Sequence, residues 1–212
     1  LIINALSGNS SVLYNLSNAR DTQTMLRLLE STDEVLDVLD AGTTMRFLTA
    51  YSLFKKQPTV LTGTERMQQR PIKILIDALR KLGAKIKYQG VEGFPPIKIK
   101  PLQVQKKNVI KIKGDVSSQY ISALLMIAPR LPEGLIINLK GKVSSRPYIQ
   151  MTLDMMKLFG IKTTWTNNTI EIERQDYLSY PYVVESDWSG ASYWYSFVAL
   201  AESAEIKLLG LR

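Results

Sequence analysis

Serine, threonine and glycine residues recur immediately before apolar runs of this chain. Ser117 and Ser118 precede one run, Gly42 and Thr43 precede another, and Ser145 stands before an Arg-Pro pair. If helices begin there, unpaired backbone N–H groups and the positive end of the helix dipole attract phosphate or carboxylate. Ordinary N-capping selects the same residue types, so one cap alone does not distinguish the two interpretations.

Two arginines favour anion binding over simple capping. Arg46 and Arg70 follow the glycine-threonine pair, and a guanidinium binds a carboxylate or a phosphate through two parallel hydrogen bonds. The alternative for Arg70 is a surface ion pair with Glu65, which contributes little to stability. Because the pattern recurs at successive helix starts, it predicts a shared site for anionic small molecules.

The composition removes other kinds of chemistry. The 212 residues include no Cys and no His, which excludes disulfides, thiolate metal sites and the usual proton-transfer side chain near neutral pH. The apolar runs are much shorter than the roughly 20 residues that a bilayer span needs. We therefore expect a soluble chain with no metal site and no membrane partner.

The formal charge of +8 arises from 27 Lys and Arg residues against 19 Asp and Glu residues. Such a charge suits anionic substrates, nucleic acid or an ordinary solvated surface. Lysine alternates with isoleucine in residues 97–100 and 110–113, a period typical of half-buried strands with a solvated face. A nucleic-acid-binding module remains an alternative, but no motif supports it, and Trp165, Trp188 and Trp194 fall at positions expected in the core.

The elements that position these residues form an internal repeat. Segments that start at Asp40, Asp115 and Asp187 each place small polar residues before an apolar helical run, at intervals of about 75 residues. A strand-like run that ends in glycine follows each helix. These runs are residues 59–63, 135–141 and 205–210.

A second helix and two more strands complete the repeat. These helices open near Arg70 and Arg146, where the next residue is proline, and end at Gly83 and Gly160. The expected strands are residues 84–88, 97–100, 161–165 and 169–173, the last two joined by an Asn-Asn turn. The pattern predicts an α+β (mixed α/β) fold of βαβαββ units around shared buried helices. Nearly complete units span about residues 36–110 and 111–182, with a partial unit at each end.

The chain begins with an apolar run and no Met, and it ends within a strand-like run. We therefore expect a fragment of a longer protein, and the lack of a leader-like segment favours a cytoplasmic location.

Four segments resemble, in order and spacing, the signature segments of the 5-enolpyruvylshikimate-3-phosphate (EPSP) synthases. They are residues 40–46 (DAGTTMR), 61–72 (LTGTERMQQRPI), 114–119 (GDVSSQ) and 143–149 (VSSRPYI). The resemblance runs through the whole chain. It implies a two-lobed fold with three βαβαββ units in each lobe, of which residues 1–212 are the N-terminal lobe. The implied partner is the C-terminal lobe of the same enzyme, which is a monomer when full length.

The resemblance also implies the family's reaction, an enolpyruvyl (carboxyvinyl) transfer of the shikimate pathway. The 5-hydroxyl of shikimate-3-phosphate adds to phosphoenolpyruvate, and the tetrahedral adduct then eliminates phosphate. The reaction needs no metal and no organic cofactor, and the family binds no nucleic acid. Its proton-transfer groups come mainly from the second lobe and from a Lys-Ser-x-Ser-x-Arg segment that would precede Leu1. We therefore assign no catalytic residue here and expect this chain to bind substrate but to be inactive alone.

Two substrate sites are implied by the same resemblance. The positions that correspond to shikimate-3-phosphate contacts are Ser117, Ser118, Gln119, Ser145 and Tyr148. Those that correspond to phosphoenolpyruvate contacts are Gly42, Arg70 and Gln119, and the supporting positions are Asp21, Thr43 and Arg46. We expect the three serines to form one phosphate site, because successive repeats would bring their helix starts together.

Two positions depart from the family's pattern. Asp40 stands where many members have Asn, and Phe47 stands where many have Pro. We expect Asp40 either to be neutralised by Arg46 or to weaken phosphoenolpyruvate binding. The related UDP-N-acetylglucosamine enolpyruvyl transferases share the repeat, but the Ser-Ser-Gln and Ser-x-x-Tyr motifs favour the shikimate enzymes.

Overall fold

A computed structural model describes residues 1–211, which divide into two compact units. The first unit comprises Leu1–Ser11 and Asn18–Tyr180. The second comprises Val12–Ser17 and the residues from Pro181 onward. Within the described residues, no helix is both long enough and apolar enough to cross a bilayer.

Two four-stranded sheets of the first unit share one topology. One sheet has the order β2-β3-β5-β4 and contains β2 (Val35–Asp37), β3 (Thr59–Thr62), β4 (Ile86–Tyr88) and β5 (Ile97–Ile99). The other has the order β6-β7-β9-β8 and contains β6 (Val109–Lys113), β7 (Leu135–Lys140), β8 (Thr164–Thr166) and β9 (Thr169–Ile172). In both sheets the first two strands are parallel and the remaining pairs are antiparallel. The predicted βαβαββ order is therefore confirmed.

The strands have the predicted half-buried pattern. The isoleucines of β5 and β6 are buried, with Ile97 and Ile99 in one strand and Ile110 and Ile112 in the other. The lysines between them lie on the opposite face, because successive side chains of a strand alternate. Much of the positive charge is therefore spread over solvated sheet faces.

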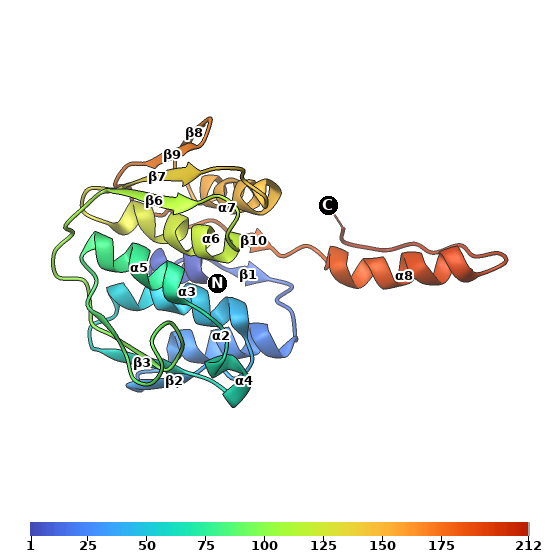
Figure 1. Cartoon of the computed structure of the whole chain (residues 1–212). Coiled ribbons are helices and arrows are strands. Elements are labelled where there is room, and N and C mark those ends of the chain that lie inside the picture. Colours follow the sequence, from blue (N-terminus) through green and yellow to red (C-terminus); the bar gives the residue numbers. More distant parts are fainter. Residues whose placement is uncertain (212) are drawn as a thin grey trace. The chain divides into compact units, whose positions relative to one another are not determined.

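Most helices of the first unit lie between the two sheets (Figure 1). The helices of this unit are α1 (Ile2–Leu6), α2 (Arg20–Glu30), α3 (Gly42–Tyr51), α4 (Glu65–Gln68), α5 (Lys73–Leu82), α6 (Ser118–Ile127) and α7 (Arg146–Leu158). Short 3₁₀ turns, η1 (Ser52–Phe54) and η2 (Ala128–Arg130), extend α3 and α6. Helix α6 packs against α1, α3, α5 and α7, and its residues 120–127 are all buried. A helix that is apolar on every side requires such a central position.

The second unit contains a two-stranded parallel sheet and one helix. Strands β1 (Leu13–Tyr14) and β10 (Tyr182–Val183) pair with each other, and the Asn15 side chain donates to the carbonyl of Val184 at 2.8 Å. Helix α8 (Trp188–Leu200) begins at Asp187, whose carboxylate accepts from the N–H of Ser189 at 2.8 Å. This cap is the one expected from the third repeat start.

Two expectations for the second unit are wrong. Residues 205–210 form no strand, because an alternating sequence also needs a partner strand to bond its backbone, and the described residues offer it none. Trp188 and Trp194 are 51% and 53% exposed, not in the core. Trp165, in the first unit, is half-buried.

The central position of α6 predicts that truncating one of its buried side chains destabilises the fold. Leu124 is fully buried in α6, so we expect Leu124→Ala to lower the free energy of unfolding by about 3 kcal/mol, as is usual for a cavity-forming core substitution. Urea denaturation measures it. Leu158→Ala is the matched control, because Leu158 ends α7 with 43% of its surface exposed. Equal losses for the two variants would contradict the assignment of α6 as the core element.

Candidate functional site

Gly42 and Arg70 lie next to each other at the first turn of α3, although 27 residues separate them in the sequence. A Cβ added to Gly42, the first residue of α3, would lie 2.7 Å from the guanidinium carbon of Arg70. Only glycine leaves room for the guanidinium at this helix start. The two residues that the resemblance assigns to one ligand are therefore neighbours.

Arg70 lines a cavity of about 350 Å³ with Asp40, Arg66 and Met67. Within residues 1–211 the structure shows no ion pair between Arg70 and Glu65 or another carboxylate. The surface ion pair considered for Arg70 is thus absent from the described chain. Its guanidinium lies at the start of α3, where an anion would interact with both the cation and the positive end of the helix dipole.

Asp40 is not neutralised by Arg46, which was one of the two alternatives for this carboxylate. The Asp40 carboxylate pairs with Arg20 at 3.2 Å and accepts a short hydrogen bond from the hydroxyl of Thr64. Arg46 points instead into the protein, because its position one turn after Gly42 lets it donate to that carbonyl at 2.9 Å. Asp40 therefore retains a cationic partner, but a different one.

Arg46 has a structural environment. It is 5% exposed, donates to the carbonyl of Pro71 at 3.4 Å, and has its guanidinium carbon 6.0 Å from the ring centroid of Tyr120. The Tyr120 hydroxyl donates to the same Pro71 carbonyl at 2.7 Å. Burial lowers the pKa of Arg46 from its usual value. Through these contacts Arg46 links α3 to α6 and to the segment before α5.

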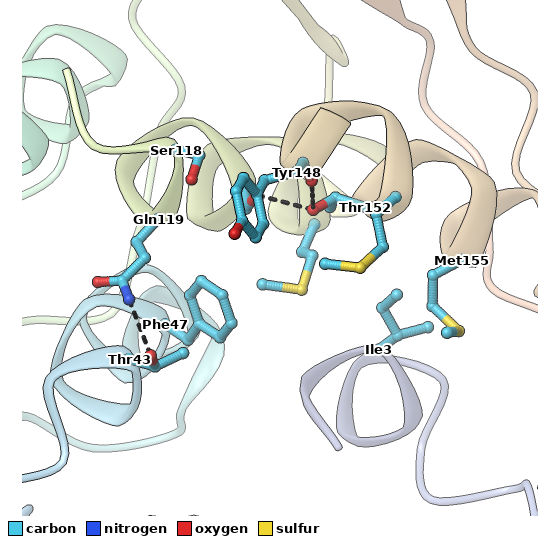
Figure 2. A pocket seen from close by; sticks show the side chains of 11 residues that line it. Ile3, Thr43, Phe47, Ser118, Gln119, Tyr148, Thr152 and Met155 are labelled. Atoms are coloured by element: carbon cyan, nitrogen blue, oxygen red, sulfur yellow. Dashed lines mark hydrogen bonds between the residues drawn. The ribbon is translucent and has the colours of Figure 1, made fainter. Parts of the chain in front are cut away.

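A second cavity, of about 370 Å³, lies among α1, α3, α6 and α7 (Figure 2). Its polar lining residues include four that the sequence predicted, namely Thr43, Ser118, Gln119 and Tyr148. The Gln119 amide donates to the Thr43 hydroxyl at 2.9 Å and so joins α6 to α3 across the two repeats. Tyr148 is 61% exposed, which leaves its ring available to a ligand.

The rest of this cavity is mainly apolar, and the sequence did not predict it. The additional lining residues are Ile3, Phe47, Ser122, Met126, Met151, Thr152 and Met155. Ser122 and Thr152 bond each other at 2.7 Å, so their hydroxyls already have partners. The spacing along α7 could have predicted these residues, because positions 148, 151, 152 and 155 share one helix face. Phe47, one of the two departures noted in the sequence, contributes its ring to the cavity wall.

The two serine segments adjoin through their backbones. The N–H of Ser144 donates to the carbonyl of Gly114 at 3.2 Å, and a Cβ added to Gly114 would lie 2.8 Å from the carbonyl oxygen of Lys142. Ser117 caps α6 by accepting from the N–H of Gln119 at 3.4 Å. Ser145 occupies the N-cap position of α7 without a side-chain cap bond.

The remaining predicted positions differ in their placement. Ser118 lines the cavity, whereas Ser117 and Ser145 belong to the adjoining segments but do not line it. Asp21 is exposed in the first turn of α2 and lines neither cavity. Among residues 1–211, no cluster of three or more acidic side chains is arranged to hold a metal ion.

The duplicated βαβαββ topology, with polar helix starts beside two cavities, defines one lobe of the enolpyruvyl transferase fold. The model of the EPSP synthase (3-phosphoshikimate 1-carboxyvinyltransferase) family matches residues 27–212, and the chain belongs to this family.

Similar proteins support this membership. The chain is 53% identical, over all of its 212 residues, to the 3-phosphoshikimate 1-carboxyvinyltransferase of Bacteroides fragilis strain YCH46, of which it covers 52%. It is 39% identical over 173 residues to the enzyme of that name from Methanothermobacter thermautotrophicus, covering 82% of this chain and 41% of the relative. The chain thus spans about half the length of the curated relatives it matches.

Solved structures support the fold. An EPSP synthase from Acinetobacter baumannii superposes on 96% of this chain with a TM-score of 0.76 and 19% sequence identity, and the match covers 52% of that structure.

The contact between Gly42 and Arg70 generates a prediction. We expect Gly42→Ala to displace the Arg70 guanidinium while changing the free energy of unfolding by less than about 1 kcal/mol, because a flexible side-chain end can move away. NMR of the arginine side-chain N–H groups and thermal melting measure the two effects. Gly90→Ala is the control, because its nearest atom, Cδ of Pro96, would lie 3.9 Å from the new Cβ. An unmoved Arg70 resonance in Gly42→Ala would contradict the contact.

Proposed function

We propose that this chain binds shikimate-3-phosphate and part of phosphoenolpyruvate as the N-terminal lobe of an EPSP synthase. One observation carries the proposal. Thr43, Ser118, Gln119 and Tyr148, from three helices and both repeats, line one cavity. The Gly42–Arg70 contact lies in the same first turn of α3 as Thr43, which supports two neighbouring anion sites.

The shikimate-3-phosphate site comprises the first turns of α6 and α7. Ser117, Ser118 and Ser145 would hold the phosphate with hydroxyls and unpaired backbone N–H groups, while Gln119 and Tyr148 would face the ring. The backbone contact between the two serine segments supports a shared phosphate position. Phosphoenolpyruvate would take its anionic contacts from Arg70, beside Gly42, and from Gln119.

The reaction of the complete protein would be enolpyruvyl transfer to the 5-hydroxyl of shikimate-3-phosphate, with release of phosphate. This chain would contribute positioning and charge complementarity. We assign no general acid or base to it and expect it to turn over no substrate without the C-terminal lobe. Two nearly complete repeats, at about residues 36–110 and 111–182, would form the lobe, within a cytoplasmic enzyme that is monomeric at full length and needs no cofactor.

The relatives favour the shikimate enzyme over the UDP-N-acetylglucosamine transferase. Both relatives described above are named 3-phosphoshikimate 1-carboxyvinyltransferase, and the 53% identity extends over the whole chain. Of the Ser-Ser-Gln and Ser-x-x-Tyr motifs that we take to favour shikimate-3-phosphate, Ser118, Gln119 and Tyr148 line the cavity.

Calorimetric titration tests the substrate. We expect the chain to bind shikimate-3-phosphate but not UDP-N-acetylglucosamine. Ser118→Ala is expected to weaken binding by about 1–3 kcal/mol, the range for a hydrogen bond to a charged group. Ser10→Ala, a substitution of an exposed serine outside the cavity, is the control. Preference for the nucleotide sugar, or an unchanged affinity in Ser118→Ala, would contradict the assignment.

Arg70 has its own test, in the complete protein. We expect Arg70→Lys to raise the phosphoenolpyruvate KM by about tenfold or more, because lysine lacks the planar fork that makes two parallel hydrogen bonds. The melting temperature and shikimate-3-phosphate affinity are expected to stay unchanged. Arg174→Lys, at an exposed position, is the control. Unaltered kinetics in Arg70→Lys would remove Arg70 from the site.

A further inference from the structure

The β8–β9 hairpin is fastened to the segment that leads into α7. Its turn contains Asn167, at φ +54°, and Asn168. The Asn168 side chain donates to the carbonyl of Gly141 at 2.9 Å, and the carbonyl of Asn168 accepts from the N–H of Leu139 at 2.8 Å. The turn is therefore hydrogen-bonded to the chain at the end of strand β7, where residues 141–145 begin.

Trp165 of the same hairpin makes a second contact, at the far end of that segment. The guanidinium carbon of Arg146 lies 4.0 Å from the centroid of the Trp165 ring. Arg146 is the first residue of α7, where a cation is unfavourable with the helix dipole, and the negative face of the ring offsets this cost. The indole N–H of Trp165 donates to the carbonyl of Asn167 at 3.1 Å, which fixes the ring on the turn.

Between these contacts the segment has few anchors of its own. Gly141 has φ +74°, and a Cβ added there would meet nothing within 4 Å. The backbone bond from Ser144 to Gly114 is the anchor in the middle of the segment. Ser145 has no side-chain cap bond, so its hydroxyl is not held by α7 itself. The hairpin thus holds both ends of the segment that carries Ser145.

We propose that Trp165 and Asn168 are positioning residues, which hold Ser145 and the first turn of α7 in the place that a phosphate ligand requires. The inference rests on the proposed shikimate-3-phosphate site. Trp165 contacts Arg146 and Asn168 bonds to Gly141, so we expect both residues to act through these contacts and not by touching the ligand. They also belong to the second repeat, away from the Gly42–Arg70 contact of the first.

The test compares variants of the whole chain by titration with shikimate-3-phosphate, by thermal melting and by amide hydrogen exchange. We expect Trp165→Ala and Asn168→Ala each to weaken binding by about threefold to tenfold, as expected when one cation–π contact or one hydrogen bond is lost. Trp165→Phe is expected to restore most of the affinity, because it keeps an aromatic face for Arg146. Thr164→Ala, an exposed substitution on the same strand, is the matched control.

Hydrogen exchange separates positioning from general stability. We expect residues 141–146 to exchange faster in Trp165→Ala and Asn168→Ala, with the melting temperature and the exchange of α6 unchanged. Unchanged affinity in both alanine variants would overturn the proposal. So would a loss that Trp165→Phe does not rescue, or a loss that accompanies a general fall in melting temperature.

The proposed function can fail separately. If the unaltered chain binds no shikimate-3-phosphate, the substrate assignment is wrong, and hydrogen exchange still decides whether the hairpin orders residues 141–146. Equal exchange of that segment in Trp165→Ala and Thr164→Ala would then overturn the positioning role as well.

Discussion

Burial of α6 is the constraint on which the rest of the structure depends. Its residues 120–127 are all buried, and no charged side chain interrupts the helix. Full burial of each large apolar side chain contributes about 1.5–3 kcal/mol, so the helix is stable only where other helices surround it. Its polar start, Ser117 to Gln119, must then emerge where that cover ends, beside the starts of α3 and α7. The candidate site is a consequence of how α6 is covered.

The two repeats are joined by polar contacts that also support the site. The carbonyl of Pro71 accepts from Tyr120 of α6 and from Arg46 of α3. Pro71 follows Arg70, so these bonds fix the backbone of the proposed phosphoenolpyruvate contact to both helices. The bond between Gln119 and Thr43 makes a second link at the cavity itself. The two proposed anion sites therefore share one rigid support, since a shift of α6 would move both.

The repeat could be predicted from the sequence because its signals are local. Apolar periodicity, glycine at helix ends and the Asn-Asn turn each act over a few residues, and together they gave the strand and helix order of both sheets. Gly42 and Arg70 were assigned to one ligand from the family resemblance, and the structure brings the two residues together.

The errors concern partners that are distant in the sequence. Asp40 pairs with Arg20 and not with Arg46, because the Arg46 guanidinium donates to the Gly42 carbonyl of its own helix. Residues 205–210 alternate like a strand, but alternation does not supply a neighbouring strand. Trp188 and Trp194 were expected at core positions, yet they are 51% and 53% exposed. Met151 and Met155, which line the cavity, were not predicted, although they lie on the same face of α7 as Tyr148.

The central claim is that the first turns of α6 and α7 form one shikimate-3-phosphate site. NMR titration of the isotopically labelled chain tests it most directly. The account predicts saturable shifts of the backbone amides of residues 117–119 and of Ser145, Arg146 and Tyr148, with small changes elsewhere in the first unit. Shifts confined to another region, such as the cavity of about 390 Å³ that Tyr51, Arg130 and Tyr177 help to line, would contradict it.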